Sequence, residues 1–202
     1  MMDKPFSPSS QENQQPILEV IAPRLAAARS VLEIGSGTGQ HGVHFAAAMP
    51  HLRWQCTDVP EHLPGIRRWI EEAGLANLPA PIAFDVDTDW SDAFSHADYD
   101  AIYSANTAHI MSLAQVERLF GGVGALLPSD GLFLLYGPFS VDGRHNSESN
   151  ARFDQMLRRN DPLSGVRDLR ELEGFARAAG LALEAEIAMP VNNRTLVWRR
   201  QP

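Results

Sequence analysis

Short apolar runs alternate with segments of helical periodicity along most of this 202-residue chain. The apolar runs predict buried strands, and the apolar spacing between some of them predicts helices. The expected strands are residues 30–34, 52–57, 80–84, 99–104 and 131–136, and the expected helices are 43–49, 63–73 and 113–127. Because strands separated by helices pair in parallel through crossover connections, this pattern predicts an α/β fold with helices on both faces of the sheet.

The two ends of the chain refine this prediction. A helix is expected from Pro16, because apolar residues recur at helical spacing through Leu25. Near the other end, helices are expected at residues 150–159 and 168–179, followed by strands at 181–189 and 194–200. Only four residues join these last strands, and so short a link permits only an antiparallel pair. The sequence therefore predicts a seven-stranded Rossmann-like sheet, parallel except for its last strand.

Composition limits the class of protein. With 44% hydrophobic and 21% charged residues, the chain is typical of a globular domain. A net charge of −8 makes nucleic acid and anionic membranes poor partners. The single cysteine, Cys56, excludes an intramolecular disulfide framework. We expect one domain over residues 16–202, preceded by a polar arm at residues 1–15. Since no signal-peptide core or bilayer-spanning run is present, we expect a cytoplasmic protein.

The segment from residue 31 to 41, VLEIGSGTGQH, carries three glycines where a buried strand turns into a helix. A dinucleotide-binding loop has the spacing G-x-G-x-x-G, but here the sixth position is Gln40. Glu33, two residues before the loop, is unfavourable beside a pyrophosphate and tolerable beside a cationic ligand. A tight strand-to-helix turn without a ligand is the alternative interpretation.

Two aspartates follow the next two expected strands. Asp58 lies about 20 residues beyond the loop, where a carboxylate can accept hydrogen bonds from both hydroxyls of a ribose. Asp85 follows the third strand, where a carboxylate can accept from an exocyclic amine such as that of adenine. Other acidic residues follow Asp85, so an ordinary acidic surface loop is the alternative there.

Glu33, the three glycines, Asp58, Asp85 and the terminal hairpin together resemble the seven-stranded S-adenosylmethionine-dependent methyltransferases over residues 30–200. More narrowly, several segments resemble the DUF938 family, also called the methyltransferase-like 26 or UPF0585 group. These segments are PILEV (16–20), LEIGSGTGQH (32–41), DAIYSANTAHI (100–110), YGPF (136–139), SNARFDQMLR (149–158) and PVNN (190–193).

The resemblance implies that S-adenosylmethionine is the cofactor and assigns residues to it. The loop residues Gly35, Ser36, Gly37 and Gly39, together with Glu33, would lie near its methionine portion. Asp58 would bind the ribose, and Asp85 with the backbone of Val86 would bind the adenine. The family pattern also covers residues 9–18, with Asn13 as a further cofactor residue, so the arm is either disordered or a lid over the cofactor.

Candidates for the chemistry lie after the fourth and fifth strands. His109 is a candidate general base, or else a structural residue of the next helix, and Asn106 is a candidate to orient substrate or cofactor. Tyr136 ends the fifth strand. The polar loop at 137–150 is expected to be a lid or binding loop, in which Arg144 and Asn150, with Arg167 further on, contact a polar or carboxylate substrate. Solvated helix faces are the alternative for the arginines.

The sequence thus predicts a methyltransferase that acts on a small molecule. Two alternatives stay open, a non-catalytic S-adenosylmethionine sensor or partner-binding protein and a nucleotide-dependent oxidoreductase. His41 and His44 stand three residues apart on one helical face, but no carboxylate partner is near them in the motif, and we expect no metal site. The oligomeric state does not follow from the sequence.

Overall fold

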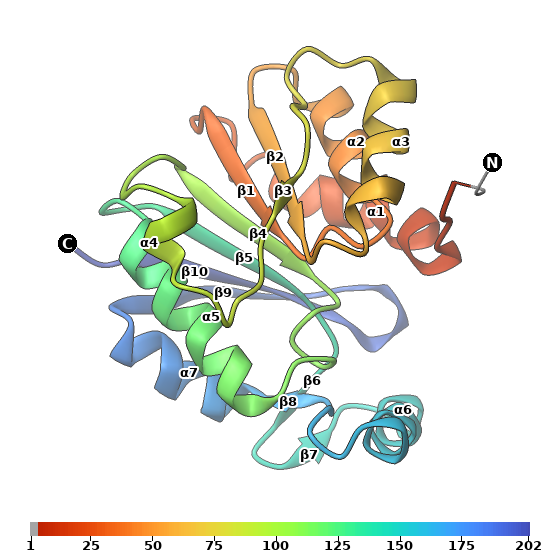
Figure 1. Ribbon diagram of the computed structural model, residues 1–202. Helices are drawn as coiled ribbons and strands as arrows, with labels where there is room; N and C mark the ends of the chain where they lie inside the picture. Colours follow the sequence, from red (N-terminus) through yellow and green to blue (C-terminus); the bar gives the residue numbers. More distant parts are fainter. Residues whose placement is uncertain (1–3) are drawn as a thin grey trace.

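A seven-stranded sheet forms the centre of the computed structural model, which describes residues 4–202 (Figure 1). The strand order is β3-β2-β1-β4-β5-β10-β9. These strands are β1 (Ser30–Ile34), β2 (Arg53–Asp58), β3 (Ile82–Ala83), β4 (Ala101–Ala105), β5 (Leu132–Gly137), β9 (Leu181–Ala188) and β10 (Arg194–Arg200). All neighbours from β3 to β5 pair in parallel, whereas β10 pairs antiparallel with both β5 and β9. The predicted fold class is confirmed.

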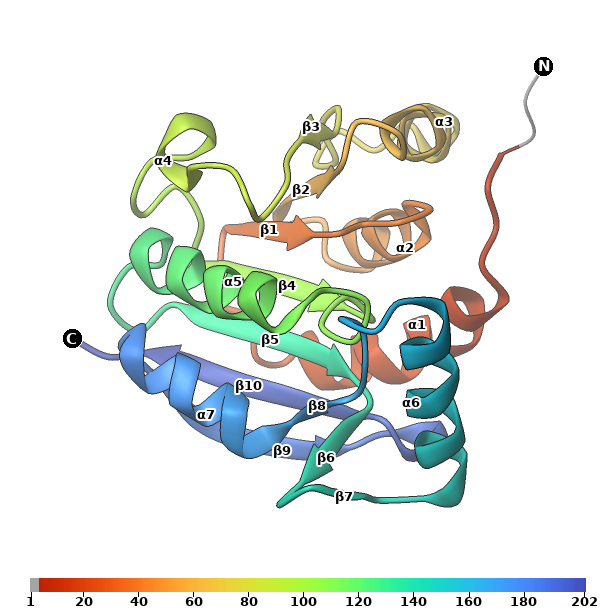
Figure 2. The same ribbon diagram turned by 60° about the horizontal axis from the view of Figure 1, so that its bottom comes forward.

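The helices cover both faces of this sheet (Figure 2). One face carries α1 (Pro8–Ile21), α2 (Gln40–Ala48) and α3 (Leu63–Ala73), and the other carries α4 (Trp90–Ala93), α5 (Leu113–Leu126) and α7 (Leu169–Ala178). Strand residues alternate between the two resulting cores, so Val31 packs with the α1–α3 face, and Leu32 and Ile34 pack with the α5–α7 face. None of the helices within residues 4–202 is long and apolar enough to cross a membrane.

The first helix begins earlier than the sequence indicated. Ser7 caps α1, because its hydroxyl accepts a hydrogen bond from the N–H of Ser10 at 3.2 Å, and Pro8 fits the first helical turn. The expected start at Pro16 is therefore wrong, and residues 8–15 are helical rather than disordered. The segment before the helix packs against the α2–α3 side, where Trp69 donates its indole N–H to the carbonyl of Pro5 at 2.8 Å.

The polar loop after β5 contributes two of the three strands of a second, small sheet, and the third lies beyond α6 (Glu148–Asn160). Its strands are β6 (Phe139–Val141), β7 (Arg144–His145) and β8 (Arg167–Asp168), in the order β7-β6-β8. Asp142 and Gly143 join β6 to β7 with positive φ angles of 52° and 73°, as a type I′ hairpin turn requires. The first half of the segment at 137–150, expected as a loop, is therefore a hairpin. The loop then leads into α6 (Glu148–Asn160), which is capped by Ser147.

Candidate functional site

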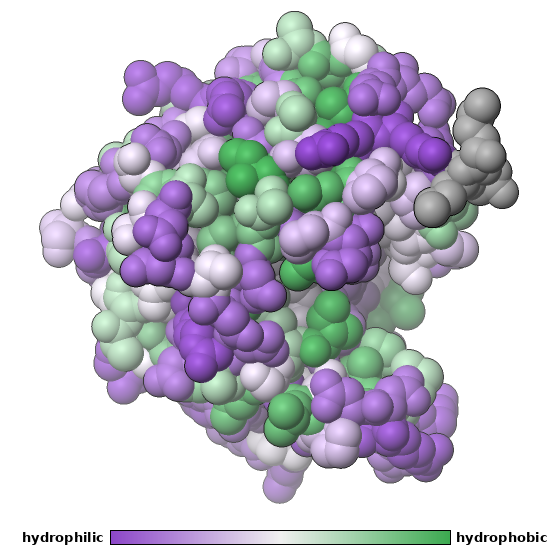
Figure 3. Space-filling model, in the orientation of Figure 1, coloured by the Kyte–Doolittle hydropathy of each residue, from purple (hydrophilic) through white to green (hydrophobic). Residues whose placement is uncertain are grey.

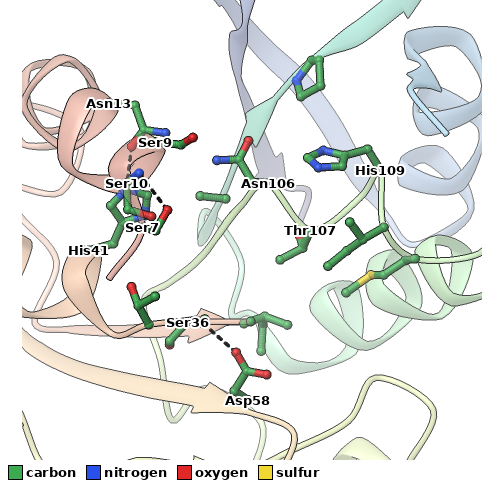
Figure 4. Close-up of a pocket in the computed structure, with 18 of the residues that line it drawn as sticks. Ser7, Ser9, Ser10, Asn13, Ser36, His41, Asp58, Asn106, Thr107 and His109 are labelled. Carbon is green, nitrogen blue, oxygen red and sulfur yellow. Dashed lines mark hydrogen bonds between the residues drawn. The ribbon is translucent and has the colours of Figure 1, made fainter. Parts of the chain in front are cut away.

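A cavity of about 790 Å³ lies where the strand order reverses between β1 and β4. In open parallel sheets this switch point, at the carboxyl ends of the strands, is where ligands bind. In Figure 4, Ser36 and Asp58 lie at one end of the cavity, Asn13 and His41 on one wall, and Asn106 and His109 on another. The first turns of α1 and α6 and the link between β9 and β10 complete the lining.

The three glycines of the loop after β1 have different roles. A Cβ on Gly35 would lie 2.6 Å from Cγ2 of Thr107, so this glycine permits close approach of the loops after β1 and β4. Gly39 has a φ of 90° and packs against Ile66 of α3, outside the cavity. Gly37 has a φ of 58°, and a Cβ there would meet nothing within 4 Å, because the residue borders the cavity. Only Gly37 therefore leaves backbone open to a ligand by lacking a side chain.

Asp58 ends β2 with its carboxylate bound to the glycine loop. Its Oδ2 accepts a hydrogen bond from the N–H of Gly37 at 2.6 Å. Its Oδ1 accepts from the N–H of Val59 at 2.8 Å and lies 2.8 Å from Nδ1 of His62. These contacts use both lone-pair sites of Oδ1 and one of Oδ2, so this buried side chain fixes the loop and still presents one acceptor site to the cavity.

Asp85 and Val86 line the same cavity beyond β3, as predicted. Val86 is buried, and Oδ1 of Asp85 accepts from the N–H of Asp87 at 2.9 Å. The structure therefore brings the first acidic residue after β3, rather than its exposed acidic neighbours, to the cavity.

A polar network connects α1 to the rest of the site. Nε2 of His41 lies 2.7 Å from Oδ1 of Asn13, and both residues line the cavity. Gln40 accepts a hydrogen bond from the N–H of Ser7 at 2.6 Å and another from the Thr38 hydroxyl at 3.0 Å. The start of α1 is thus bonded directly to the first turn of α2, and through the Gln40 side chain to Thr38 of the glycine loop.

Asn106 and His109 lie together after β4. Asn106 has a left-handed φ of 59°, and its N–H donates to the carbonyl of Tyr136 at 2.9 Å. Its Oδ1 and Nδ1 of His109 each lie 4.0 Å from the position that a Cβ on Gly137 would occupy. A strained non-glycine backbone at a cavity is typical of functional sites, so both side chains remain candidates for contact with reacting groups.

Burial keeps two imidazoles of the cavity neutral. Desolvation, helped by His44, lowers the pKa of His41 to about 4. Desolvation, helped by the positive charge of Arg167, also lowers the pKa of His109 to about 4. Both side chains are therefore hydrogen-bonding groups without charge at neutral pH.

These lowered pKa values predict that acid destabilises the fold. Because the unfolded imidazoles have a pKa near 6.5, the unfolded chain binds more protons between pH 6.5 and pH 4, and stability is lost as the pH falls through this range. From pH 7 to pH 5 the expected loss is about 2 kcal/mol for each imidazole. Urea unfolding of the wild type and of His41→Gln at pH 7 and pH 5 measures this loss of unfolding free energy. The variant is expected to lose about 2 kcal/mol less, and an equal loss in both proteins would contradict a neutral, buried His41.

Three of the residues predicted to bind the cofactor or take part in the chemistry lie outside the cavity lining. Glu33 is on the α1–α3 face of β1, where it accepts from the indole N–H of Trp54 at 2.9 Å and from Cys56 Sγ at 3.3 Å. Burial raises the pKa of this carboxyl. Tyr136 is buried behind the cavity, and its hydroxyl accepts from Asn193 Nδ2 at 2.9 Å. Gly39, as described above, contacts α3 instead.

The residues predicted to bind the substrate also fall partly inside and partly outside the cavity lining. Asn150 lines the cavity, where its Nδ2 donates to Asn146 Oδ1 at 2.7 Å and to the carbonyl of Asn192 at 3.0 Å. Arg144 is exposed on β7, outside the lining. Arg167 is buried, and its guanidinium donates to the carbonyls of Ala108, Met111 and Leu163. Neither Arg144 nor Arg167 lines the cavity, so the expected contact of these arginines with a polar or carboxylate substrate finds no support in this site.

The sequence did not assign several lining residues to the site. They are Ser7, Ser10, Thr38, His41, Thr107, Ile110, Met111, Phe153, Val191 and Asn193. Many lie within segments that carry the family resemblance, notably SANTAHI and PVNN, so position inside those segments was the available signal.

Solved structures of methyltransferases superpose on this chain. An O-methyltransferase family protein from Burkholderia thailandensis has a TM-score of 0.82 and 20% identity, covering 96% of this chain and 57% of that one. The S-adenosylmethionine-dependent methyltransferase SibL, in its apo form, has a TM-score of 0.79 and 25% identity, covering 96% of this chain and 56% of that one. Human N-acetylserotonin methyltransferase in complex with SAM has a TM-score of 0.78 and 14% identity, covering 96% of this chain and 53% of that one.

The chain spans a little over half the length of these structures. Their likeness shows that the fold is the Rossmann-like methyltransferase fold. A family model described as "Protein of unknown function (DUF938)" matches residues 4–200. The family predicted from the sequence is therefore confirmed, and this chain is a member of the DUF938 family.

Proposed function

We propose that this chain binds S-adenosylmethionine in the cavity at the switch point and transfers its methyl group to a small molecule. One observation carries the proposal. The open backbone at Gly37, the carboxylate of Asp58 and the Asp85–Val86 pair lie in one cavity, at the ends of β1, β2 and β3 in turn. Solved methyltransferases of the same fold support it.

The lining residues fit the cofactor part by part. The gap at Gly37 gives room for a ligand against the loop backbone. Asp58 has one free acceptor site on Oδ2 and gains a second on Oδ1 when the exposed His62 ring turns aside, so it can bind two ribose hydroxyls. Asp85 with the Val86 backbone offers an acceptor and a donor to an adenine ring. Ser10 and Asn13 of α1, with Thr38, supply polar groups for an amino-acid portion.

The charges of the lining favour this cofactor over a dinucleotide. Among the described residues around the cavity there is no lysine or arginine, and Asp58 and Asp85 are the carboxylates. This lining suits a cationic sulfonium and is unfavourable for a pyrophosphate. The first turn of α2, where a pyrophosphate would bind, is bonded to the N–H of Ser7 through the Gln40 side chain. A nucleotide-dependent oxidoreductase is therefore the weaker alternative.

The residues after β4 would hold the acceptor. When bound, S-adenosylmethionine supplies an electrophilic methyl group, and its transfer leaves S-adenosylhomocysteine. The protein's main task in such a displacement is to position the nucleophile and to exclude water. Neutral His109 can accept a hydrogen bond from the hydroxyl group of a methyl acceptor, and the side-chain amide of Asn106 can orient that hydroxyl. Since a pKa of about 4 makes the His109 imidazole a weak base, its role is to position the hydroxyl, whose proton passes to solvent.

Thermal unfolding tests the choice of cofactor. At 100 times its dissociation constant, a ligand of the folded state adds about 2.7 kcal/mol of stability, which raises the midpoint of a chain of this size by about 5–10 °C. We expect this rise with S-adenosylmethionine and S-adenosylhomocysteine and none with NADH. A rise with NADH alone would support the oxidoreductase instead. Binding of the cofactor without methyl transfer to any acceptor would support the non-catalytic sensor.

A further inference from the structure

The part of the cavity near His109 lacks charged side chains. The two carboxylates of the lining lie after β2 and β3, whereas the loop after β4, α6 and the link after β9 contribute uncharged residues. A carboxylate or phosphate on an acceptor would therefore enter this region without a cationic partner. Burying an unpaired anion costs several kcal/mol, so the lining selects against anionic acceptors.

Two arginines from the segments around this region are bound elsewhere. The guanidinium of Arg167 is committed to three backbone carbonyls beneath the loop after β4. Arg158 forms an ion pair with Asp154, with Nε 2.9 Å from Oδ2. Neither side chain lines the cavity. A rotation of Arg167 toward a ligand would leave buried carbonyls without donors, which costs about 1–3 kcal/mol for each group.

Apolar side chains form the walls and mouth of the same region. Phe153 of α6 lies edge-on to the His109 ring, with 5.1 Å between centroids, and Met111 lies on the loop after β4. Ile110 and Val191 line the cavity and are 59% and 77% exposed. The face in Figure 3 is hollowed above α6, and apolar side chains border the hollow. Exposed apolar residues at a cavity mouth are typical of a binding surface for an apolar ligand.

Backbone strain marks one of these residues. Val191 has φ 58° and ψ 33°, a left-handed conformation that is rare for a β-branched residue. Hydrogen bonds from Asn146 and Asn150 to the carbonyl of Asn192 hold this link against α6. Strain of this kind costs about 1–3 kcal/mol and persists where the position of a side chain serves function.

We propose that the methyl acceptor is a small hydroxylated or amino compound with an apolar, aromatic-sized body and no anionic group. Its body lies against Met111, Phe153 and Val191, and its nucleophilic atom lies at Asn106 and His109. The acceptor's lone pair forms the new bond to the methyl carbon as the carbon–sulfur bond breaks, and that bonding pair stays on sulfur. The proton of the acceptor's O–H or N–H group then passes to solvent. This inference rests on the proposed function, which supplies the methyl donor.

Matched probes test this inference on the 202-residue chain saturated with S-adenosylhomocysteine. Ligand-observed NMR at neutral pH compares methyl 3,4-dihydroxybenzoate with 3,4-dihydroxybenzoate, and the uncharged aromatic amine 4-propylaniline with 3-(4-aminophenyl)propanoate. We expect the ester and the amine to bind at least tenfold more tightly than the matching carboxylates. Equal or tighter binding of the carboxylates, or no binding of the ester and the amine, would overturn the proposal.

Two variants place the binding in this region. Ile110→Lys adds a cation at the mouth and is expected to lower the preference for the ester over its carboxylate about two- to fivefold. Leu163 is 66% exposed and lies outside the lining, so the control Leu163→Lys is expected to leave this preference unchanged. Val191→Gly, relaxed at a positive φ, is expected to weaken ester binding about fivefold. If neither the ester preference of Ile110→Lys nor the ester affinity of Val191→Gly changes, the proposed location of the methyl acceptor is overturned.

Calorimetry on the same samples separates the two hypotheses. If S-adenosylhomocysteine binds but the ester and the amine do not, only the inference about the acceptor fails. If S-adenosylhomocysteine itself does not bind to the folded protein, the proposed function fails and this inference fails with it.

Discussion

Replacing Gly37 by valine is expected to weaken the binding of S-adenosylhomocysteine at least about 100-fold while the chain still folds. A Cβ at this position meets no protein atom within 4 Å, so the new side chain would occupy the space proposed for the cofactor. Loss of about 2.7 kcal/mol of binding free energy corresponds to this factor. Calorimetric titration measures the affinity, and circular dichroism verifies the fold.

Gly74 provides a matched control for this substitution. It ends α3 with a φ of 59°, close to the 58° of Gly37, and a Cβ there also meets nothing within 4 Å. It lies outside the cavity lining. Gly74→Val therefore introduces the same backbone strain, about 1–2 kcal/mol, without blocking the site. Wild-type affinity in Gly37→Val, or an equal loss in both variants, would show that the ligand does not lie against the glycine loop.

The positions of the strands and the antiparallel pairing of the last two could be predicted from the sequence because local patterns determine them. The apolar run at 131–136 corresponds to β5 (Leu132–Gly137), and the four-residue link fixes β9 and β10 as an antiparallel pair. The carboxyl ends of β1, β2 and β3 bring the glycine loop, Asp58 and Asp85 to one cavity because parallel strands end at the same edge.

Other residues were misplaced because their surroundings come from distant parts of the chain. Arg167 bonds to carbonyls almost 60 positions earlier, and no local pattern reveals such a contact. Glu33 follows the two-residue alternation of its strand and shares the face of Val31, so it contacts Trp54 rather than the cavity. This alternation was visible in the sequence, and so was the Asp142-Gly143 pair that closes the hairpin.

The start of α1 escaped prediction for a related reason. Residues 8–15 are polar and carry few apolar positions of helical spacing. Their helix is supported by the Ser7 cap and by contacts to Gln40 and His41, which lie on another element. These contacts place Asn13 in the cavity lining, although most of the preceding residues resemble a disordered arm in composition.

Asp58→Ala is expected to lower the affinity for S-adenosylhomocysteine at least about 100-fold. Hydrogen bonds to a charged group contribute about 1.5–3 kcal/mol each, and the proposed ribose contact contains two of them. The substitution also removes the acceptor that fixes the N–H of Gly37. Asp87→Ala is the matched control, because Asp87 is exposed, pairs with Arg118 and lies outside the lining.

Titration of S-adenosylhomocysteine into the wild type, Asp58→Ala and Asp87→Ala by calorimetry tests the cofactor site most directly. We predict saturable binding in the wild type and in Asp87→Ala, with at least about a 100-fold loss in Asp58→Ala. Absence of binding to the folded wild type, or equal affinity in all three proteins, would contradict an S-adenosylmethionine site in this cavity.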